Sequence, residues 1–487
     1  MILLNFINRT VFIKCLSAEY LGVNGLFTNI ITILSLAELG FGEAIVYSMY
    51  KPLAGHDDYK LKSLMDLYAS IYKIIGCVVG VLGILVIPFL DVLIKDKPNI
   101  PNITIIYLLF LLNSVSSYFF TYKRSIIIAD QRRYIYSKYQ LVFALIKVAA
   151  QIIILYLTRN FIIYLLIQIL CTLAENISIS LCANKLYPFL KSKEKLKLAV
   201  EEKNTIFTNV KALIIYKIGS VALDGTGNLI ISAFVGVISV GKLSNYTLII
   251  GSVAMLLTQI VSSITASVGN FIAKEGEDRQ IYLFNVVNFT HFILYSICSV
   301  CLLFLLTPFV SLWVGNAYVL DNTTTIIIVL NFYINGMMNP VWTFRGTMGL
   351  FVYGRYRPLI SALINLVVSI FLAKLMGLPG VLLGTTITRL ATNVWFDPLI
   401  IYKYGFKKSV FKYYIKYIAY FAILLFCTML VYLATMSFSS NTWISLLGLL
   451  AICLIITTAI LYAIFHKTEE YKYLYNNTIK SLLHHGK

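Results

Sequence analysis

The feature that most constrains this chain is a block of about 20 mostly apolar residues, long enough to cross a bilayer as a helix, that recurs along its length. We predict fourteen such membrane segments over the 487 residues. Transmembrane strands are shorter and alternate in polarity, so these blocks exclude a β-barrel. The predicted fold is therefore an all-α integral membrane protein with about 14 transmembrane helices. The segments are 1–14, 20–48, 74–94, 103–122, 139–158, 161–183, 210–235, 244–272, 282–313, 323–344, 358–378, 380–402, 413–436 and 442–465.

Composition removes several other classes of protein. Hydrophobic residues make up 59% of the chain and charged residues 13%, whereas a soluble domain has roughly 45–50% and about 25%. A soluble enzyme, a disordered protein and a secreted disulfide scaffold are excluded. Most of the eight cysteines lie inside apolar blocks, so we interpret even the Cys298/Cys301 pair as packing residues and predict no metal site.

The basic residues predict the orientation of the chain. The formal net charge of +19 would suggest nucleic acid in a soluble protein. Here 29 Lys and Arg fall in the even-numbered turns and the C-terminal tail, and 5 fall in the odd-numbered turns. Because cytoplasmic loops collect basic residues, we expect the even turns and both termini in the cytoplasm, and no nucleic-acid partner.

A polar, basic stretch predicts the domain boundary. Residues 184–209 follow the sixth segment and are expected to form a cytoplasmic linker between two six-helix lobes, 1–183 and 210–402. Two additional helices over 403–465 and a cytoplasmic tail over 466–487 follow. The first block is short, so we expect the chain to begin part-way into its first helix. A further stretch, 59–73, is predicted to be an amphipathic helix on the cytoplasmic surface.

Ionisable residues inside the segments point to a hydrated cavity. Each costs about 2.5–3.5 kcal/mol at a helix centre, so they must form ion pairs that fix packing or line water. For the set as a whole we favour a central cavity. The residues are Arg9, Glu38, Glu43, Asp91, Lys147, Glu175, Lys217, Asp224, Arg389 and Asp397.

The cations in this set suit an anionic substrate, because Arg and Lys are the usual ligands of phosphate. The candidate substrate-binding residues are Arg9, Lys147, Lys217 and Arg389. Three acids, Glu38, Glu175 and Asp224, are candidate counter-ions or carriers of a coupling proton or sodium ion. We find no nucleotide-binding glycine loop and no catalytic motif, and we expect a transporter without a cofactor rather than an enzyme.

Several stretches together resemble a known family, the Wzx-type polysaccharide flippases of the multidrug/oligosaccharidyl-lipid/polysaccharide exporter superfamily. The first is RTVFIKCLSAEYLGVNGLFTNIITILSLAELGFGEAIVYSMYKPL (9–53), and the others are YKRSIIIADQRRYI (122–135), YKIGSVALDGTGNLIISAFVGVISVGKLSNYTLI (216–249), SVGNFIA (267–273) and NLVVSIFLAKLMGLPGVLLGTTIT (365–388). The chain departs from the family where it has TGN (226–228) in place of the usual TDN, with the acid at Asp224 instead.

The resemblance implies two six-helix lobes around a central cavity. It also implies a polyprenyl-diphosphate-linked oligosaccharide repeat unit as substrate, moved from the inner to the outer leaflet of a bacterial cytoplasmic membrane by alternating access. Other membrane proteins of polysaccharide assembly are then candidate partners. Two alternatives stay open, a drug/cation antiporter of the same superfamily and a membrane oligosaccharide polymerase or ligase. Short outward turns disfavour the enzyme.

Overall fold

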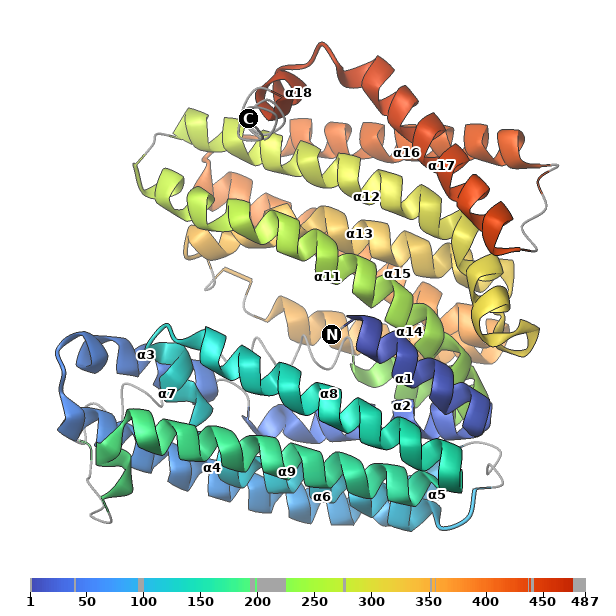
Figure 1. The fold of residues 1–487 in the computed structure, drawn as a ribbon. Helices are drawn as coiled ribbons and strands as arrows, with labels where there is room; N and C mark the ends of the chain where they lie inside the picture. Colours follow the sequence, from blue (N-terminus) through green and yellow to red (C-terminus); the bar gives the residue numbers. More distant parts are fainter. Residues whose placement is uncertain are drawn as a thin grey trace, which may run out of the picture. The chain divides into compact units, whose positions relative to one another are not determined.

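The computed structural model describes residues 2–38, 41–94, 100–192, 198, 225–274, 277–350, 353–354, 356–436, 438 and 442–475. All regular secondary structure in these ranges is helical, which confirms the all-α class. The chain forms two compact units, which Figure 1 draws as one ribbon. Unit 1 is Met1–Gly241 with Pro358–Leu363, and unit 2 is Lys242–Arg357 with Ile364–Lys487.

Unit 1 is built from helices. They are α1 (Ile2–Cys15), α2 (Ala18–Leu34), η1 (Ser35–Glu38), α3 (Phe41–Ala54), α4 (Asp58–Val86), η2 (Ile87–Phe89), α5 (Leu90–Leu93), α6 (Ile103–Thr121), α7 (Arg124–Ala129), α8 (Arg133–Thr158), α9 (Phe161–Leu186) and η3 (Pro188–Lys191). Residues 225–234 are also helical.

Unit 2 contains longer helices. Those that lie wholly or mainly in it are α11 (Val237–Lys274), α12 (Glu277–Val314), η4 (Asn316–Tyr318), α13 (Asn322–Thr347), α14 (Arg357–Met376), α15 (Leu378–Ile400), the π-helical turn η5 (Ile401–Gly405), α16 (Phe411–Thr435), α17 (Trp443–Phe465) and α18 (Glu469–Leu474).

Ten helical segments among the described residues are long and apolar enough to cross a membrane, so the chain is a multi-pass membrane protein. The predicted count of fourteen stays a prediction. Helix α1 is short, and α15 carries four threonines, Arg389 and Asn393, which make it more polar than the ten. The predicted linker 184–209 and segment 210–235 lie largely outside the described residues, so the predicted domains also stay predictions.

Two predicted elements are wrong. The segment 20–48 is not one helix, because α2 ends at Leu34, a 3₁₀ turn follows, and α3 begins at Phe41. The stretch 59–73 is not a separate surface helix, because it is the first part of the continuous helix α4. Its apolar side chains, such as Leu64 and Tyr68, are buried in the core of unit 1. A helix lying in the membrane surface would leave that face to lipid.

Polar residues next to the apolar runs explain where several helices begin. The Asp57 side chain accepts a hydrogen bond from the Lys60 backbone N–H at the start of α4, and Asp321 does the same for Thr324 at the start of α13. Asn160 accepts from two N–H groups at the start of α9. Such caps satisfy backbone donors that have no partner within the helix.

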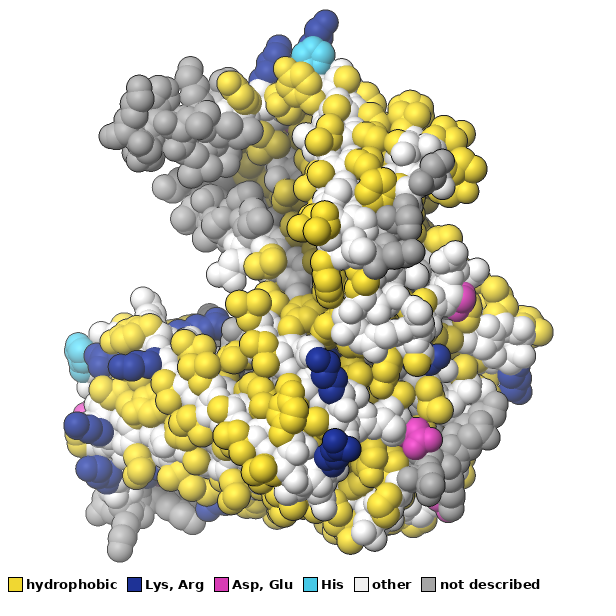
Figure 2. Space-filling view, turned by 45° about the vertical axis from the view of Figure 1, so that its right-hand side comes forward, with side chains coloured by type: hydrophobic (Ala, Val, Ile, Leu, Met, Phe, Trp, Pro, Cys, Tyr) yellow, Lys and Arg dark blue, Asp and Glu magenta, His cyan; other side chains and the backbone are white. Residues whose placement is uncertain are grey.

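The outer faces of the helices are apolar. Figure 2 shows hydrophobic side chains spread widely over the visible surface, with only scattered charged ones. On α17, for example, Ile444, Leu447 and Ile455 are all more than 60% exposed. Exposed apolar side chains at this density are what a helix in contact with lipid hydrocarbon requires.

Candidate functional site

Unit 1 contains an open cavity between its helices, and most of the residues that line it are polar. Its volume is about 450 Å³, within the 300–1,000 Å³ that is typical of small-molecule sites. Side chains from α2, η1, α6, α7 and α9 line it, and eleven of the sixteen are polar but uncharged. The lining residues are Thr28, Ile31, Thr32, Ser35, Glu38, Phe110, Asn113, Ser114, Ser117, Tyr118, Thr121, Arg124, Gln168, Thr172, Glu175 and Asn176.

The polar side chains recur at helical spacing. Thr28, Thr32 and Ser35 stand four and three residues apart, and α6 and α9 carry similar stripes. Residues three and four apart lie on one face of a helix, so each stripe can face one cavity. We singled out only charged residues in the sequence and missed these stripes. A search for polar periodicity inside the apolar segments would have found them.

The cavity brings together two predicted acids, Glu38 and Glu175, and adds a cation that we had assigned to a cytoplasmic turn, Arg124. Arg124 and Lys147 both act electrostatically on Glu175. The charged groups that line the cavity are thus two carboxylates and one guanidinium. Carboxylates of this kind can hold a proton or a cation, whereas the amides and hydroxyls can donate to and accept from an uncharged polar ligand.

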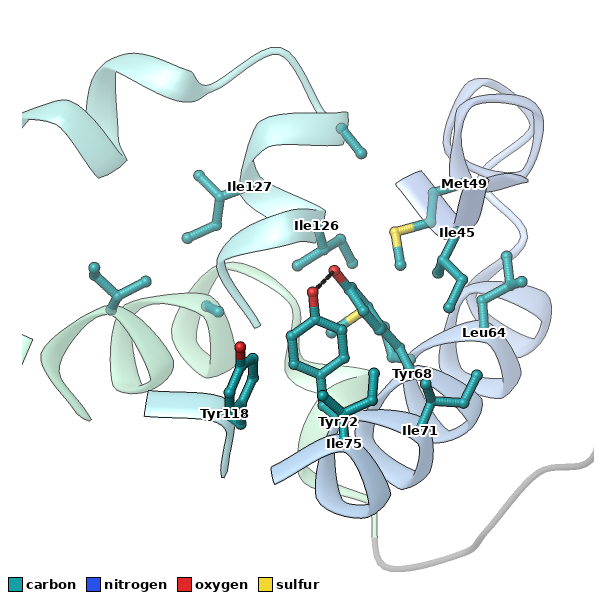
Figure 3. Close-up of a cluster of buried hydrophobic side chains, with 14 of the residues drawn as sticks. Ile45, Met49, Leu64, Tyr68, Ile71, Tyr72, Ile75, Tyr118, Ile126 and Ile127 are labelled. Atoms are coloured by element: carbon teal, nitrogen blue, oxygen red, sulfur yellow. Dashed lines mark hydrogen bonds between the residues drawn. The ribbon is translucent and has the colours of Figure 1, made fainter. Parts of the chain in front are cut away.

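Glu38 is held by tyrosines from the neighbouring helices. The Tyr72 hydroxyl donates a hydrogen bond to its carboxylate, and Tyr68 donates to Tyr72 over 3.1 Å. The two rings pack edge to face with centroids 4.5 Å apart (Figure 3). Tyr118, which lines the cavity, also interacts with Glu38. The carboxylate is therefore fixed in place at one wall of the cavity.

Of the predicted cations, Arg9, Lys147 and Arg389 are not among the described residues that line this cavity. Arg9 lies half-buried in α1, beside Asn8, which donates to Gln151 and to the Tyr164 hydroxyl. Lys147 lies half-buried in α8. A shared role for these cations therefore stays a prediction.

The other predicted site residues are placed elsewhere or not described. Arg389 belongs to α15 in unit 2, where its guanidinium lies 3.4 Å from the backbone and side-chain oxygens of Asn331. Lys217 and Asp224 lie outside the described residues.

A second charged cluster is buried in unit 2. The Asp397 carboxylate in α15 is fully buried and pairs with Arg345 at 2.7 Å and with Arg357 at 3.3 Å. Trp342 donates to its second oxygen over 3.0 Å. Arg345 also donates to the backbone carbonyls of Leu350 and Tyr353, so the cluster ties the connection between α13 and α14 to α15. This acid forms ion pairs that fix helix packing, the first of the two roles considered for such residues.

Comparison with known proteins gives the fold. No family model matches the chain, and no curated protein matches it. Among solved structures, the lipid II flippase MurJ in an inward closed conformation superposes with a TM-score of 0.65 at 16% identity, covering 95% of this chain and 98% of that one. An inward-facing multidrug resistance MATE family transporter of the MOP superfamily gives a TM-score of 0.57 at 15% identity, covering 83% and 96%. The Vibrio cholerae MATE transporter VcmN in its bent form gives 0.54 at 15% identity, covering 82% and 92%. At these identities the likeness establishes a shared fold.

Proposed function

We propose that this chain is a flippase that moves a polyprenyl-diphosphate-linked oligosaccharide from the inner to the outer leaflet by alternating access. The observation that carries the proposal is the polar cavity among membrane helices. Its lining of hydroxyls and amides with two aromatic rings, Phe110 and Tyr118, matches the alternating hydroxyls and apolar faces of a sugar. A sugar crossing a bilayer needs such partners, because hydrocarbon offers none.

The remaining roles extend this proposal. Arg9, Lys147, Lys217 and Arg389 bind the diphosphate, because guanidinium and ammonium groups are its natural partners. The acids Glu38, Glu175 and Asp224 carry the coupling ion or act as counter-charges. The fold shared with the MurJ flippase supports a lipid-linked substrate. The protein would then reside in a bacterial cytoplasmic membrane with both termini in the cytoplasm, and supply units for cell-surface polysaccharide.

The direct test follows lipid-linked oligosaccharides in a strain that lacks the gene. We expect complete repeat units to accumulate on the cytoplasmic side, with surface polysaccharide lost. Complete units that reach the outer leaflet but stay unpolymerised would identify a polymerase or ligase and reject the proposal.

Single variants then test the cavity in the complemented strain. Thr172→Ala, in the lining, should lower export at unchanged membrane abundance. Thr247→Ala is the matched control, because Thr247 is exposed on α11 in unit 2 and its hydroxyl donates to the Ser244 backbone carbonyl of its own helix. Equal export by the two variants would show that the cavity does not lie on the transport path.

A drug/cation antiporter is the second candidate, and one observation favours it. The cavity lining carries two carboxylates and one guanidinium, a balance that suits a cationic ligand. The fold is also that of MATE transporters. An antiporter would protect cells against cationic dyes and leave lipid-linked oligosaccharides unchanged when deleted, so the same deletion strain separates the two functions.

A further inference from the structure

Three hydroxyl groups form a buried chain that ends on Glu38. Ser125 Oγ donates to the Tyr68 hydroxyl over 3.2 Å, Tyr68 donates to the Tyr72 hydroxyl over 3.1 Å, and Tyr72 donates to the Glu38 carboxylate. The chain crosses three elements, α7, α4 and η1. All three hydroxyl-bearing residues are less than 10% exposed.

The direction in which these hydroxyls donate their hydrogen bonds follows from the group at the end of the series, Glu38. An ionised carboxylate only accepts hydrogen bonds, so the Tyr72 proton must point at Glu38. The Tyr72 oxygen must then accept from Tyr68, and the Tyr68 oxygen from Ser125. Every hydroxyl therefore donates toward Glu38, one of the two carboxylates that face the cavity.

The surroundings keep water away from the two tyrosine hydroxyls. Figure 3 shows the paired tyrosines between Ile45, Met49, Ile126 and Ile127, all fully buried in the core of unit 1. In such a medium, hydrogen-bonded hydroxyls polarise one another and have no competing solvent.

Few charged groups surround the end of the chain. On the side of Glu38 that faces the cavity, the titratable and charged groups in the described lining are Tyr118 of α6, Arg124 of α7 and Glu175 of α9, with Lys147 of α8 acting on Glu175.

We propose that Ser125, Tyr68 and Tyr72 form a proton relay that protonates and deprotonates Glu38. A proton from water binds Ser125 Oγ while the Ser125 hydroxyl proton passes to the Tyr68 oxygen. The Tyr68 proton then passes to Tyr72, and the Tyr72 proton passes to Glu38. One O–H bond forms on the carboxylate for each proton taken up, and every hydroxyl keeps one proton. The inference rests on the proposed function in one respect, because it identifies the coupling ion carried by Glu38 as H⁺.

The same geometry disfavours sodium at Glu38. A hard cation is bound by oxygen lone pairs that converge on it. Here the Tyr72 hydroxyl directs a proton at one carboxylate oxygen and accepts a hydrogen bond from Tyr68, so it adds little to a converging set of lone pairs. Protonation uses the bond from Tyr72, whereas sodium would have to bind the other lone pairs of the carboxylate without help from Tyr72.

Infrared difference spectroscopy on the purified full chain tests the relay without a substrate. The carbonyl band of protonated Glu38 is isolated by subtraction of the Glu38→Gln spectrum and followed after a pH jump. Tyr68→Phe leaves the Tyr72–Glu38 bond in place, so the band should reach its full amplitude but appear about a hundredfold more slowly, as for the loss of one positioned proton-transfer group. Ser125→Ala should act in the same direction.

Tyr107→Phe is the matched control. Tyr107 is also fully buried in unit 1 and donates to the Gly83 carbonyl over 2.8 Å, outside the relay, so its loss should leave the rate unchanged. Wild-type rates in both relay variants would overturn the proposal. So would the absence of a Glu38 band at any pH, or loss of the band in sodium chloride but not in choline chloride. Because no substrate is added, the relay and the flippase proposal can fail independently.

Discussion

At the scale of single residues, the fully buried carboxylate of Asp397 is a position in unit 2 where substitution should be costly. Replacing it by Asn removes the negative charge with which the buried Arg345 and Arg357 pair. Breaking a buried pair in this way costs about 3–5 kcal/mol, because the uncompensated charge stays out of water. We expect Asp397→Asn to lose stability by that amount in unfolding measured in detergent.

Asp278→Asn is the control for this prediction. Asp278 pairs with Lys408, and the two side chains are 85% and 50% exposed. Exposed pairs contribute little, so the change should stay within about 0.5 kcal/mol. Equal losses in the two variants would mean that the Asp397 cluster does not stabilise unit 2.

Glu470, outside the membrane segments, gives a pH-dependent prediction. Burial alone would raise the pKa of Glu470, but the hydrogen bond from Lys416, 2.7 Å away, and its charge outweigh burial and lower it. A lowered pKa means that the pair contributes stability above the unfolded value of about 4.3 and loses it as the pH falls further. Glu470→Gln should therefore be less stable than wild type by about 0.2–1 kcal/mol at pH 7, and the difference should shrink as the pH falls below the unfolded value. A difference that is the same at pH 7 and pH 3 would contradict this.

Sequence reasoning found individual charges better than their partners. It identified Glu38 and Glu175, and the structure places both on one cavity. It grouped Arg9 and Lys147 into the same kind of site, and neither lines that cavity. The sequence shows which charged residues lie inside apolar segments, and such residues stand out because a buried charge is costly wherever it lies. The partner of a charge depends on which face each helix turns toward its neighbours. A membrane helix is apolar both toward lipid and toward other helices, so its pattern of apolar residues does not show which face that is.

At the scale of elements, the apolar blocks predicted helix ends closely. The segments 161–183 and 442–465 correspond to α9 and α17, which end within three residues of the predicted bounds. Length and hydropathy are sufficient there, because a span must be helical throughout. They were insufficient at 20–48, where the helix breaks, and at 59–73, where the polar residues concealed a buried face.

Small residues set the spacing of two neighbouring helices. A Cβ atom on Gly384 of α15 would lie 2.7 Å from the Ser369 Cα of α14, too close for either backbone to stay in place. Gly384→Ala should therefore destabilise unit 2 by about 1–3 kcal/mol through overpacking, despite the better helix propensity of alanine. The measurement is thermal unfolding of the purified protein in detergent.

Gly251→Ala provides the comparison on α11. Nothing lies within 4 Å of a Cβ atom at this position. The substitution should therefore stabilise the protein by up to about 1 kcal/mol, through helix propensity alone. Stabilisation by both substitutions would show that α14 and α15 do not need close contact at Gly384.

At the scale of the whole molecule, the path of the chain across the membrane is the property on which the proposed function depends. A flippase with its linker and termini in the cytoplasm requires the turns to alternate in side. The charge count predicts such alternation, and ten spans are apolar enough to support it. Helix α15 is the least certain crossing to infer from hydropathy, because its polar residues exclude it from the ten apolar spans. The alternation of turns in unit 2 nevertheless requires α15 to cross the membrane.

Two engineered cysteines on either side of α13, α14 and α15 test this point directly. In a background without the eight native cysteines, Ala317→Cys lies in the exposed turn η4, and Ser409→Cys lies in the exposed turn before α16. Three crossings place the two turns on opposite sides of the membrane. In intact cells we expect an impermeant maleimide to label position 317 and to reach position 409 only after permeabilisation. Labelling of both from outside would mean that one of the three helices does not cross, and α15 would be the first to examine. Labelling of 409 alone would keep the crossings but reverse the orientation, which would put the basic turns outside and contradict the charge rule.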